Sequence, residues 1–168
     1  MKIPWWVWIA LTSVAACSPG SQVQQDRTAT NLPGAMSVQP VPPLASLKDA
    51  APNANWDERS VLYDDFDCDG VRDLAALGRR DGGVAVGVAR ASGGPPAILE
   101  FALSGSVQAA ICAEPARLQT ESQEQPDDSL EGFRASRTCK GLVLSGGECD
   151  PVHIYWNHER KGVGWWRN

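Results

Sequence analysis

The sequence has little positive charge, with 15 lysine and arginine residues against 20 aspartate and glutamate residues and a formal net charge of −5. Proteins that bind nucleic acid carry a basic surface, so we expect no nucleic-acid partner. Short catalytic motifs are also absent: the chain has no Gly-x-Ser-x-Gly, no His-Glu-x-x-His and no phosphate-binding loop. It contains only two histidines. These absences favour a protein that is not an enzyme.

The apolar run at the start of the chain, residues 3–16, is too short to span a bilayer, which takes about 20 apolar residues. Lys2 is the only charged residue up to residue 16, as expected of a signal peptide. The run closes with Val-Ala-Ala-Cys at residues 14–17, which resembles the bacterial lipobox, where the signal peptide is cut before a cysteine that carries lipid. We therefore expect residues 1–16 to be removed and Cys17 to be the lipidated anchor, with palmitate among its acyl groups.

The alternative to a lipobox is an ordinary signal peptide cut near Ala16, with Cys17 left as a stray thiol. In lipobox proteins an aspartate after the cysteine typically marks retention in the inner membrane, and Ser18 stands here. The resemblance therefore implies the outer membrane of a Gram-negative cell, with the folded part facing the periplasm.

Residues 18–55 are rich in proline, serine, glutamine, alanine and threonine, a composition that cannot bury enough apolar surface to fold. We expect residues 17–55 to be a lipidated, disordered tether and residues 56–168 to be one small domain. Residues 1–16 contain one lysine and no acidic residue, so the remaining chain has 14 basic and 20 acidic residues and a net charge of −6. A domain of this size has a marginal core, which cross-links would reinforce.

Beyond Cys17 the chain has four cysteines, none in Cys-x-x-Cys spacing: Cys68, Cys112, Cys139 and Cys149. In an oxidising compartment an even number in a small domain indicates disulfides, here two, with three connectivities open. Cys139 and Cys149 flank the hairpin signal at residues 145–147, and a bridge between them would close that hairpin. This favours Cys139–Cys149, and Cys68–Cys112 then follows by elimination.

From residue 62 onward, short apolar runs alternate with turn residues, a pattern typical of strands rather than helices. The expected strands cover residues 74–78, 84–88, 97–103, 117–121, 141–145, 152–156 and 163–167. The first three predict a meander and the last three a second hairpin system. A short helix is expected at residues 106–112. The sequence thus predicts an all-β domain of six or seven strands, mainly antiparallel and cross-linked by disulfides.

Carboxylates alternate along the segment that precedes the meander. Four side chains and one backbone carbonyl offer oxygen ligands there: Asp65, Asp67, Asp69, Asp73 and the carbonyl of Val71. Gly70 supplies the positive φ of a sharp turn, and hard oxygen ligands suit Ca²⁺. An EF-hand would need a glutamate where Ala76 stands; the segment instead resembles the calcium loop of FG-GAP and related β-propeller repeats, Asp-x-Asp-x-Asp-Gly-x-x-Asp. We expect a structural Ca²⁺ site, the alternative being an acidic turn held by hydrogen bonds without metal.

His153 and His158 are the candidates for chemistry, as a general base or as ligands of a transition metal. They are five residues apart, on an expected strand and the turn after it, so they need not face the same side. A histidine in such a place usually has a structural role. We therefore assign no catalytic residue.

Two tryptophans in the last expected strand are candidates for binding. Trp165 and Trp166 are adjacent, so their side chains must point to opposite faces, and one of them is then exposed or half covered. Together with the basic turn residues Arg160 and Lys161, it would form a patch for a protein partner.

Residues 133–168 carry a longer pattern, with Ser-Arg-Thr-Cys-Lys-Gly-Leu at 136–142, Gly-Glu-Cys-Asp-Pro-Val-His at 147–153 and Tyr-Trp-Asn-His at 155–158. The segment resembles a group of uncharacterised proteobacterial lipoproteins that join an acidic calcium loop to this pattern, a likeness that implies no activity. The architecture of lipobox, tether, calcium loop and β domain is also similar to periplasmic immunity lipoproteins that inhibit lysozyme-like toxins. We therefore expect a calcium-stabilised binding lipoprotein of this kind; the alternatives are a cell-envelope enzyme using His153 or His158 and a structural envelope lipoprotein.

Overall fold

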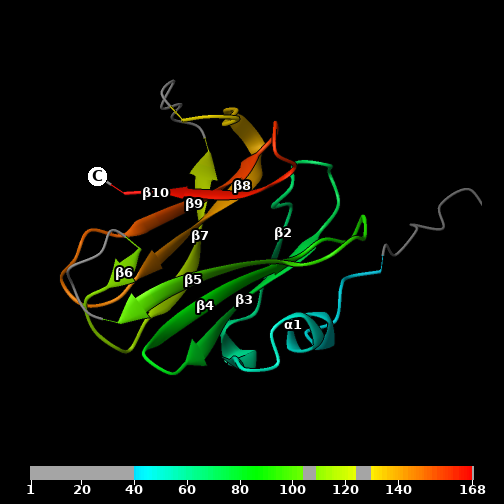
Figure 1. Cartoon of the computed structure of the whole chain (residues 1–168). Coiled ribbons are helices and arrows are strands. Elements are labelled where there is room, and N and C mark those ends of the chain that lie inside the picture. The colour runs from blue at the N-terminus through cyan, green and yellow to red at the C-terminus, as the bar shows by residue number, and fades with distance from the viewer. Residues whose placement is uncertain (1–39, 104–108, 124–129, 168) are drawn as a thin grey trace, which may run out of the picture. The chain divides into compact units, whose positions relative to one another are not determined.

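The computed structural model describes residues 40–103, 109–123 and 130–167 of the chain. Two β-sheets pack face to face, with one short helix against the outer side of the first sheet (Figure 1). None of the helices in these ranges is long and apolar enough to cross a membrane. The predicted fold class, a mainly antiparallel all-β domain with disulfides, is confirmed.

The first sheet has six strands and is built around the predicted meander. Its strands are β1 (Asn55–Trp56), β2 (Leu62–Asp64), β3 (Asp73–Arg80), β4 (Gly83–Ala89), β5 (Ala97–Leu103) and β6 (Ala110–Ile111). The order is β1-β3-β4-β5-β6, and β2 pairs with the first residues of β3. Strands β3, β4 and β5 are antiparallel neighbours, whereas β6 runs parallel to β5.

The second sheet has four antiparallel strands in the order β10-β9-β8-β7. They are β7 (Arg117–Gln123), β8 (Ser136–Ser145), β9 (Val152–Asn157) and β10 (Gly162–Trp166). The register aligns Gln119, Val143, His153 and Trp166 in one row across the sheet. Directly paired residues in neighbouring strands point to the same face, so these four side chains share a surface.

The core between the sheets is filled by every second residue of the facing strands. On β4 the valines at 84, 86 and 88 are each about 1 % exposed and pack with Phe101 of β5. Leu142 and Leu144 of β8 and Ile154 of β9 meet them from the second sheet. The alternation of residues that predicts these strands therefore also places their apolar side chains in the core.

Strand β4 is buried on both faces because the outer face of the first sheet is covered by α1 (Ala45–Ala50) and Trp56. Leu47 of α1 has no exposed surface and packs with Trp56 in a second apolar cluster. Gly87 lies beneath both, and a Cβ there would be 2.7 Å from Cη2 of Trp56, so a larger residue would push the cover away. A 3₁₀ turn (Glu58–Ser60) leads from β1 toward β2.

The folded domain begins before the predicted boundary at residue 56, since α1 and the start of β1 lie inside the segment expected to be a tether. The composition of this segment was misleading because a few apolar side chains, Leu44, Leu47, Ala51 and Ala54, pack it against the first sheet. A helix of six residues is too short to show a periodic pattern. The signal peptide, Cys17 and tether residues 18–39 lie outside the described residues.

The predicted number of disulfides is correct but the predicted pairing is wrong. The bridges are Cys68–Cys139 and Cys112–Cys149, with Cα–Cα distances of 4.9 and 5.6 Å. Cys139 lies near the start of the long strand β8 and reaches the loop before β3, whereas Cys149 lies in the β8–β9 turn and reaches the residue after β6. Each bridge therefore joins the two sheets, which sequence spacing around one hairpin cannot reveal.

Two further expectations about secondary structure need correction. Residues 110–111, within the expected helix at 106–112, form β6, while residues 104–108 lie outside the described ranges. The short helix is α1 instead. The described ranges hold ten strands rather than six or seven, because β1, β2 and β6 are only two or three residues long and carry no local pattern.

Candidate functional site

The acidic segment forms a tight loop, residues 65–72, that joins the end of β2 to the start of β3. Two of its residues have positive φ, Gly70 at 86° and Cys68 at 65°. A non-glycine residue in the left-handed region is unfavourable, so Cys68 needs outside support. The disulfide to Cys139 of β8 supplies it, and the Lys140 amide donates a hydrogen bond to the Asp65 carbonyl at 2.9 Å.

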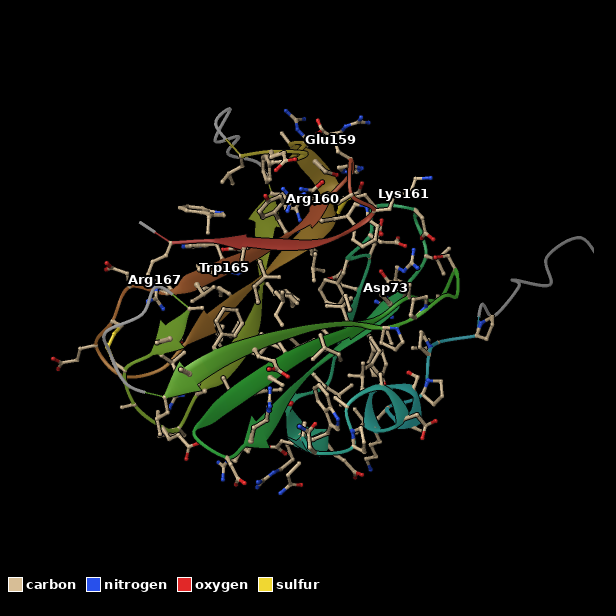
Figure 2. All side chains as sticks on the ribbon, in the orientation of Figure 1. Asp73, Glu159, Arg160, Lys161, Trp165 and Arg167 are labelled. Atoms are coloured by element: carbon tan, nitrogen blue, oxygen red, sulfur yellow. A yellow bond between two sulfur atoms is a disulfide. The ribbon has the colours of Figure 1, made fainter. Side chains whose placement is uncertain are left out.

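Three of the four predicted carboxylate ligands converge. One oxygen each of Asp65, Asp67 and Asp73 lies within 4.8 Å of the others. Asp73 has no exposed surface and Asp67 is 8 % exposed, so two of the three are taken out of water. Figure 2 shows Asp73 at the base of this loop, where β3 begins. Three carboxylates gathered at one buried point form the kind of oxygen-rich donor set that Ca²⁺ prefers.

Backbone amides hold these carboxylates in place. The Asp73 carboxylate accepts from the amides of Phe66, Asp67 and Ala91 at 2.9–3.0 Å. The Asp65 carboxylate accepts from the amides of Asp69 and Gly70 at 3.1 and 3.0 Å. Each carboxylate oxygen has two lone pairs, so these bonds orient the groups and still leave acceptor capacity for a cation.

The second hairpin of the meander also contributes to the site. The hydroxyl of Ser92, in the turn between β4 and β5, donates to Asp67 at 3.1 Å, and the neighbouring Ala91 amide donates to Asp73. Neither residue has a sequence signal that identifies it, because both lie about twenty positions from their partners in an ordinary glycine-rich turn. The packing of β4 beside β3 brings them there.

Two of the three converging aspartates have raised pKa values. Burial raises the pKa of Asp73 from an ordinary 3.8 to about 6, and the charge of Asp67 adds to the rise against the opposing amide hydrogen bonds. Burial also raises the pKa of Asp67, helped by the charge of Asp69. At Asp67 and Asp73 the surroundings therefore disfavour two bare negative charges, which a proton or a nearby cation would relieve.

The Asp69 carboxylate is not among the three converging carboxylates. Asp69 is exposed, and its side chain accepts a hydrogen bond from the Val71 amide at 2.8 Å, which shapes the turn. Of the four predicted carboxylate ligands, three therefore converge and Asp69 shapes the turn, while the Val71 carbonyl stays a prediction.

The two adjacent tryptophans point to opposite faces of the second sheet, as predicted. Trp165 packs inward, edge-on to Phe101 of β5 with ring centroids 5.8 Å apart (Figure 2). Trp166 lies on the outer face, stacked on His153 with centroids 4.3 Å apart and planes 16° from parallel. Trp166 is therefore the surface candidate and Trp165 a core residue.

His153 belongs to a small cluster that the sequence did not identify. Its Nδ1 lies 2.8 Å from Oε2 of Glu121 on β7, while Trp166 covers its ring face. Burial raises the pKa of Glu121, although the hydrogen bond and charge of His153 oppose the rise. We call these three residues the outer-face cluster. Glu121 stood in an expected strand, but its pairing with His153 depends on a strand register that local patterns do not give.

His158 is separate from this cluster. It follows β9, and burial together with the charge of Arg134 lowers its pKa. The two histidines therefore do not form one site.

The basic residues of the expected partner patch are also apart from Trp166. Arg160 and Lys161 lie in the turn before β10 (Figure 2). Trp166 is the last residue of that strand. Arg160 forms an exposed ion pair with Glu131, and Lys161 has a positive φ of 51° that suits a tight turn. The predicted patch of four residues is thus not a single surface.

Comparison of the chain with family models, curated proteins and solved structures gives no match.

Proposed function

We propose that this protein is a non-enzymatic binding lipoprotein, held on the outer membrane by lipid on Cys17 and facing the periplasm. The lipobox at residues 14–17 supports the anchor. Two disulfides that join the sheets suit a small domain in an oxidising compartment. The single observation that carries the binding role is the rigid aromatic surface at the outer-face cluster.

A structural Ca²⁺ in the acidic loop is part of this proposal. Asp65, Asp67 and Asp73 would hold the ion, and their converging carboxylates fit a hard cation. The ion would offset the burial and the repulsion that raise the pKa of both aspartates. Its role is to stabilise the junction of loop, β3 and the β4–β5 turn rather than to activate a substrate.

The outer-face cluster has the properties of a binding anchor. Trp166 is half-buried and its orientation is fixed by stacking on His153, which is fixed in turn by Glu121. An aromatic side chain that is already immobilised loses little conformational entropy on binding. Residues of this kind dominate the free energy of many protein interfaces.

In its most specific form, the proposal is that the protein is an immunity or inhibitor protein whose partner is a secreted cell-wall hydrolase. The likeness to periplasmic immunity lipoproteins supports it, together with an acidic chain that would meet a basic partner with complementary charge.

A cell-envelope enzyme is the second candidate, and the His153–Glu121 pair favours it. A carboxylate that orients a histidine is the arrangement of many general bases. Here, however, Trp166 covers one face of the imidazole, which suits a supporting role better than proton transfer to a substrate.

A pull-down of envelope proteins and secreted hydrolases with the full chain tests the binding role. Trp166→Ala should weaken capture by about 2 kcal/mol or more, as for an interface hot spot. Tyr63→Ala is the matched control, because Tyr63 is an exposed aromatic on the first sheet. Equal capture by both variants would refute the assignment of Trp166.

A turnover assay on peptidoglycan tests the enzyme alternative in the same preparations. Glu121→Gln keeps a hydrogen-bonding partner for His153 but removes the negative charge that a general base needs. We expect no hydrolysis by either protein. Hydrolysis by the wild type that Glu121→Gln abolishes would replace the binding proposal with the enzyme.

A further inference from the structure

A hollow of about 310 Å³ lies where the chain enters the domain, between residues 40–46 and the turn that joins β4 to β5. Figure 1 shows the segment before α1 passing near the tip of this hairpin. The walls are mainly apolar and include four prolines, Pro40, Pro42, Pro43 and Pro96. Arg90 is the only charged residue among those that line the hollow, which we call the Arg90 pocket.

The guanidinium of Arg90 is held from two sides. Its Cζ lies 5.5 Å from the ring centroid of Trp156, which is only 6 % exposed, a distance within the range of cation–π contacts. On another side stands Gly94, with a φ of 91°, where a Cβ would overlap Nη2 of Arg90. The positive φ favours glycine there, and a larger residue would displace the end of the Arg90 side chain.

The charge of Arg90 has no carboxylate partner within the described ranges, whose ion pairs all involve other residues. An aromatic ring orients a guanidinium but does not neutralise it. Arginine presents a planar fork of N–H donors that matches a carboxylate, and the pocket combines this fork with apolar walls. A ligand that satisfies both features has one carboxylate and a compact apolar body.

We propose that the Arg90 pocket binds such a carboxylate ligand. The same chemistry is offered by a small apolar acid and by the C-terminal carboxylate of a short apolar peptide. The volume is at the small end of the range for small-molecule sites. The pocket shares no residue with the outer-face cluster and none with the acidic loop itself; of the residues that contact the loop it includes only Ala91, whose amide donates to Asp73.

Nuclear magnetic resonance titration of the ¹⁵N-labelled full chain tests the proposal. Benzoate should shift the amide signals of Gly93 and Gly94 and the Nε signal of Arg90 in a saturable way. Benzamide has the same shape without the charge and should bind at least about tenfold more weakly. An N-acetylated leucine peptide with a free or an amidated C-terminus provides the second pair of probes.

Variants then assign the effect to the arginine fork. Arg90→Gln should lower benzoate affinity by about tenfold or more, and Arg90→Lys should lower it less, because it keeps the charge but loses the paired donors. Arg137→Gln, at an exposed position of β8, is the control and should leave affinity unchanged.

Binding of benzoate but not of the peptide with a free C-terminus would assign the pocket to small acids. Binding of both would show that the pocket also accepts the C-terminal carboxylate of a peptide. Equal binding of benzoate and benzamide would overturn the proposal, as would no saturable binding by either acid or an unchanged affinity in Arg90→Gln. The comparison of acids with amides uses the unaltered chain, so it remains decisive if a variant fails to fold.

Discussion

The stability of the protein without metal should fall as the pH rises from about 4 to about 7, and Asp73 should account for much of the loss. The carboxyl of Asp73 is fully buried, and its pKa of about 6 lies above the ordinary value of 3.8 that applies to the unfolded chain. Between these two values the folded state binds more protons than the unfolded state. Stability therefore decreases with rising pH in this window.

The size of the effect follows from the pKa difference. A rise from 3.8 to about 6 corresponds to about 3 kcal/mol, since each pKa unit is worth 1.36 kcal/mol. The contribution is fully present below the unfolded value and is lost once the pH exceeds the folded value. The raised pKa of Asp67 acts in the same direction, so the folded domain is penalised for ionising both groups.

Urea unfolding in the presence of a chelator, followed by tryptophan fluorescence at several pH values, measures this loss. In Asp73→Asn the dependence between pH 4 and 7 should shrink by about 3 kcal/mol, whatever the absolute stability of the variant. Asp81→Asn, in the exposed β3–β4 turn, is the control and should keep the wild-type slope. An equal slope in wild type and Asp73→Asn would refute the buried-carboxylate argument.

Calcium should reverse the trend. An ion that binds only the folded state stabilises it by mass action, and it binds more tightly once its ligands have lost their protons. With saturating Ca²⁺, stability should therefore rise between pH 4 and 7, and Asp67→Ala should abolish that rise. Identical curves of stability against pH with Ca²⁺ and with chelator would refute the Ca²⁺ site, and the loop would then be an acidic turn without metal.

Three other outcomes are expected. Cys17→Ala should abolish palmitate labelling and membrane association; unchanged fractionation would contradict the lipid anchor. Non-reducing peptide mapping should recover Cys68 linked to Cys139, whereas a Cys68–Cys112 peptide would contradict the structure. Trp165→Ala should cost about 3 kcal/mol of stability because its ring packs on Phe101, and a neutral effect in urea unfolding would refute its place in the core.

The meander could be predicted because its local pattern and its environment agree. The valines at 84, 86 and 88 alternate with small residues, and the glycines at 82, 93 and 94 lie in the turns on either side of β4. The same holds for the turn at residues 146–147, which joins β8 to β9. In these segments the alternation of residues shows which side chains face the core between the sheets. A period of two is therefore sufficient to predict the strands.

The features that sequence did not reveal depend on contacts between distant segments. The spacing of aspartates predicted the convergence of Asp65, Asp67 and Asp73, but not the donors from residues 91 and 92. Alternation predicted that Trp165 and Trp166 diverge, but only the register with β9 decides which one stacks on His153. Disulfide pairing failed for the same reason, since each bridge crosses between sheets.

The disulfide and the proposed Ca²⁺ would hold the acidic loop independently, and this decides how the domain should respond to a chelator. The Cys68–Cys139 bridge fixes the loop to the second sheet whether or not a cation is bound. A chelator alone should therefore lower the melting temperature while the far-ultraviolet circular dichroism stays folded, in contrast to small domains that unfold without their metal. A reductant alone removes about 2–4 kcal/mol for each bridge. Only the two treatments together should unfold the domain at ambient temperature, and unfolding by chelator alone would show that the bridge does not hold the loop.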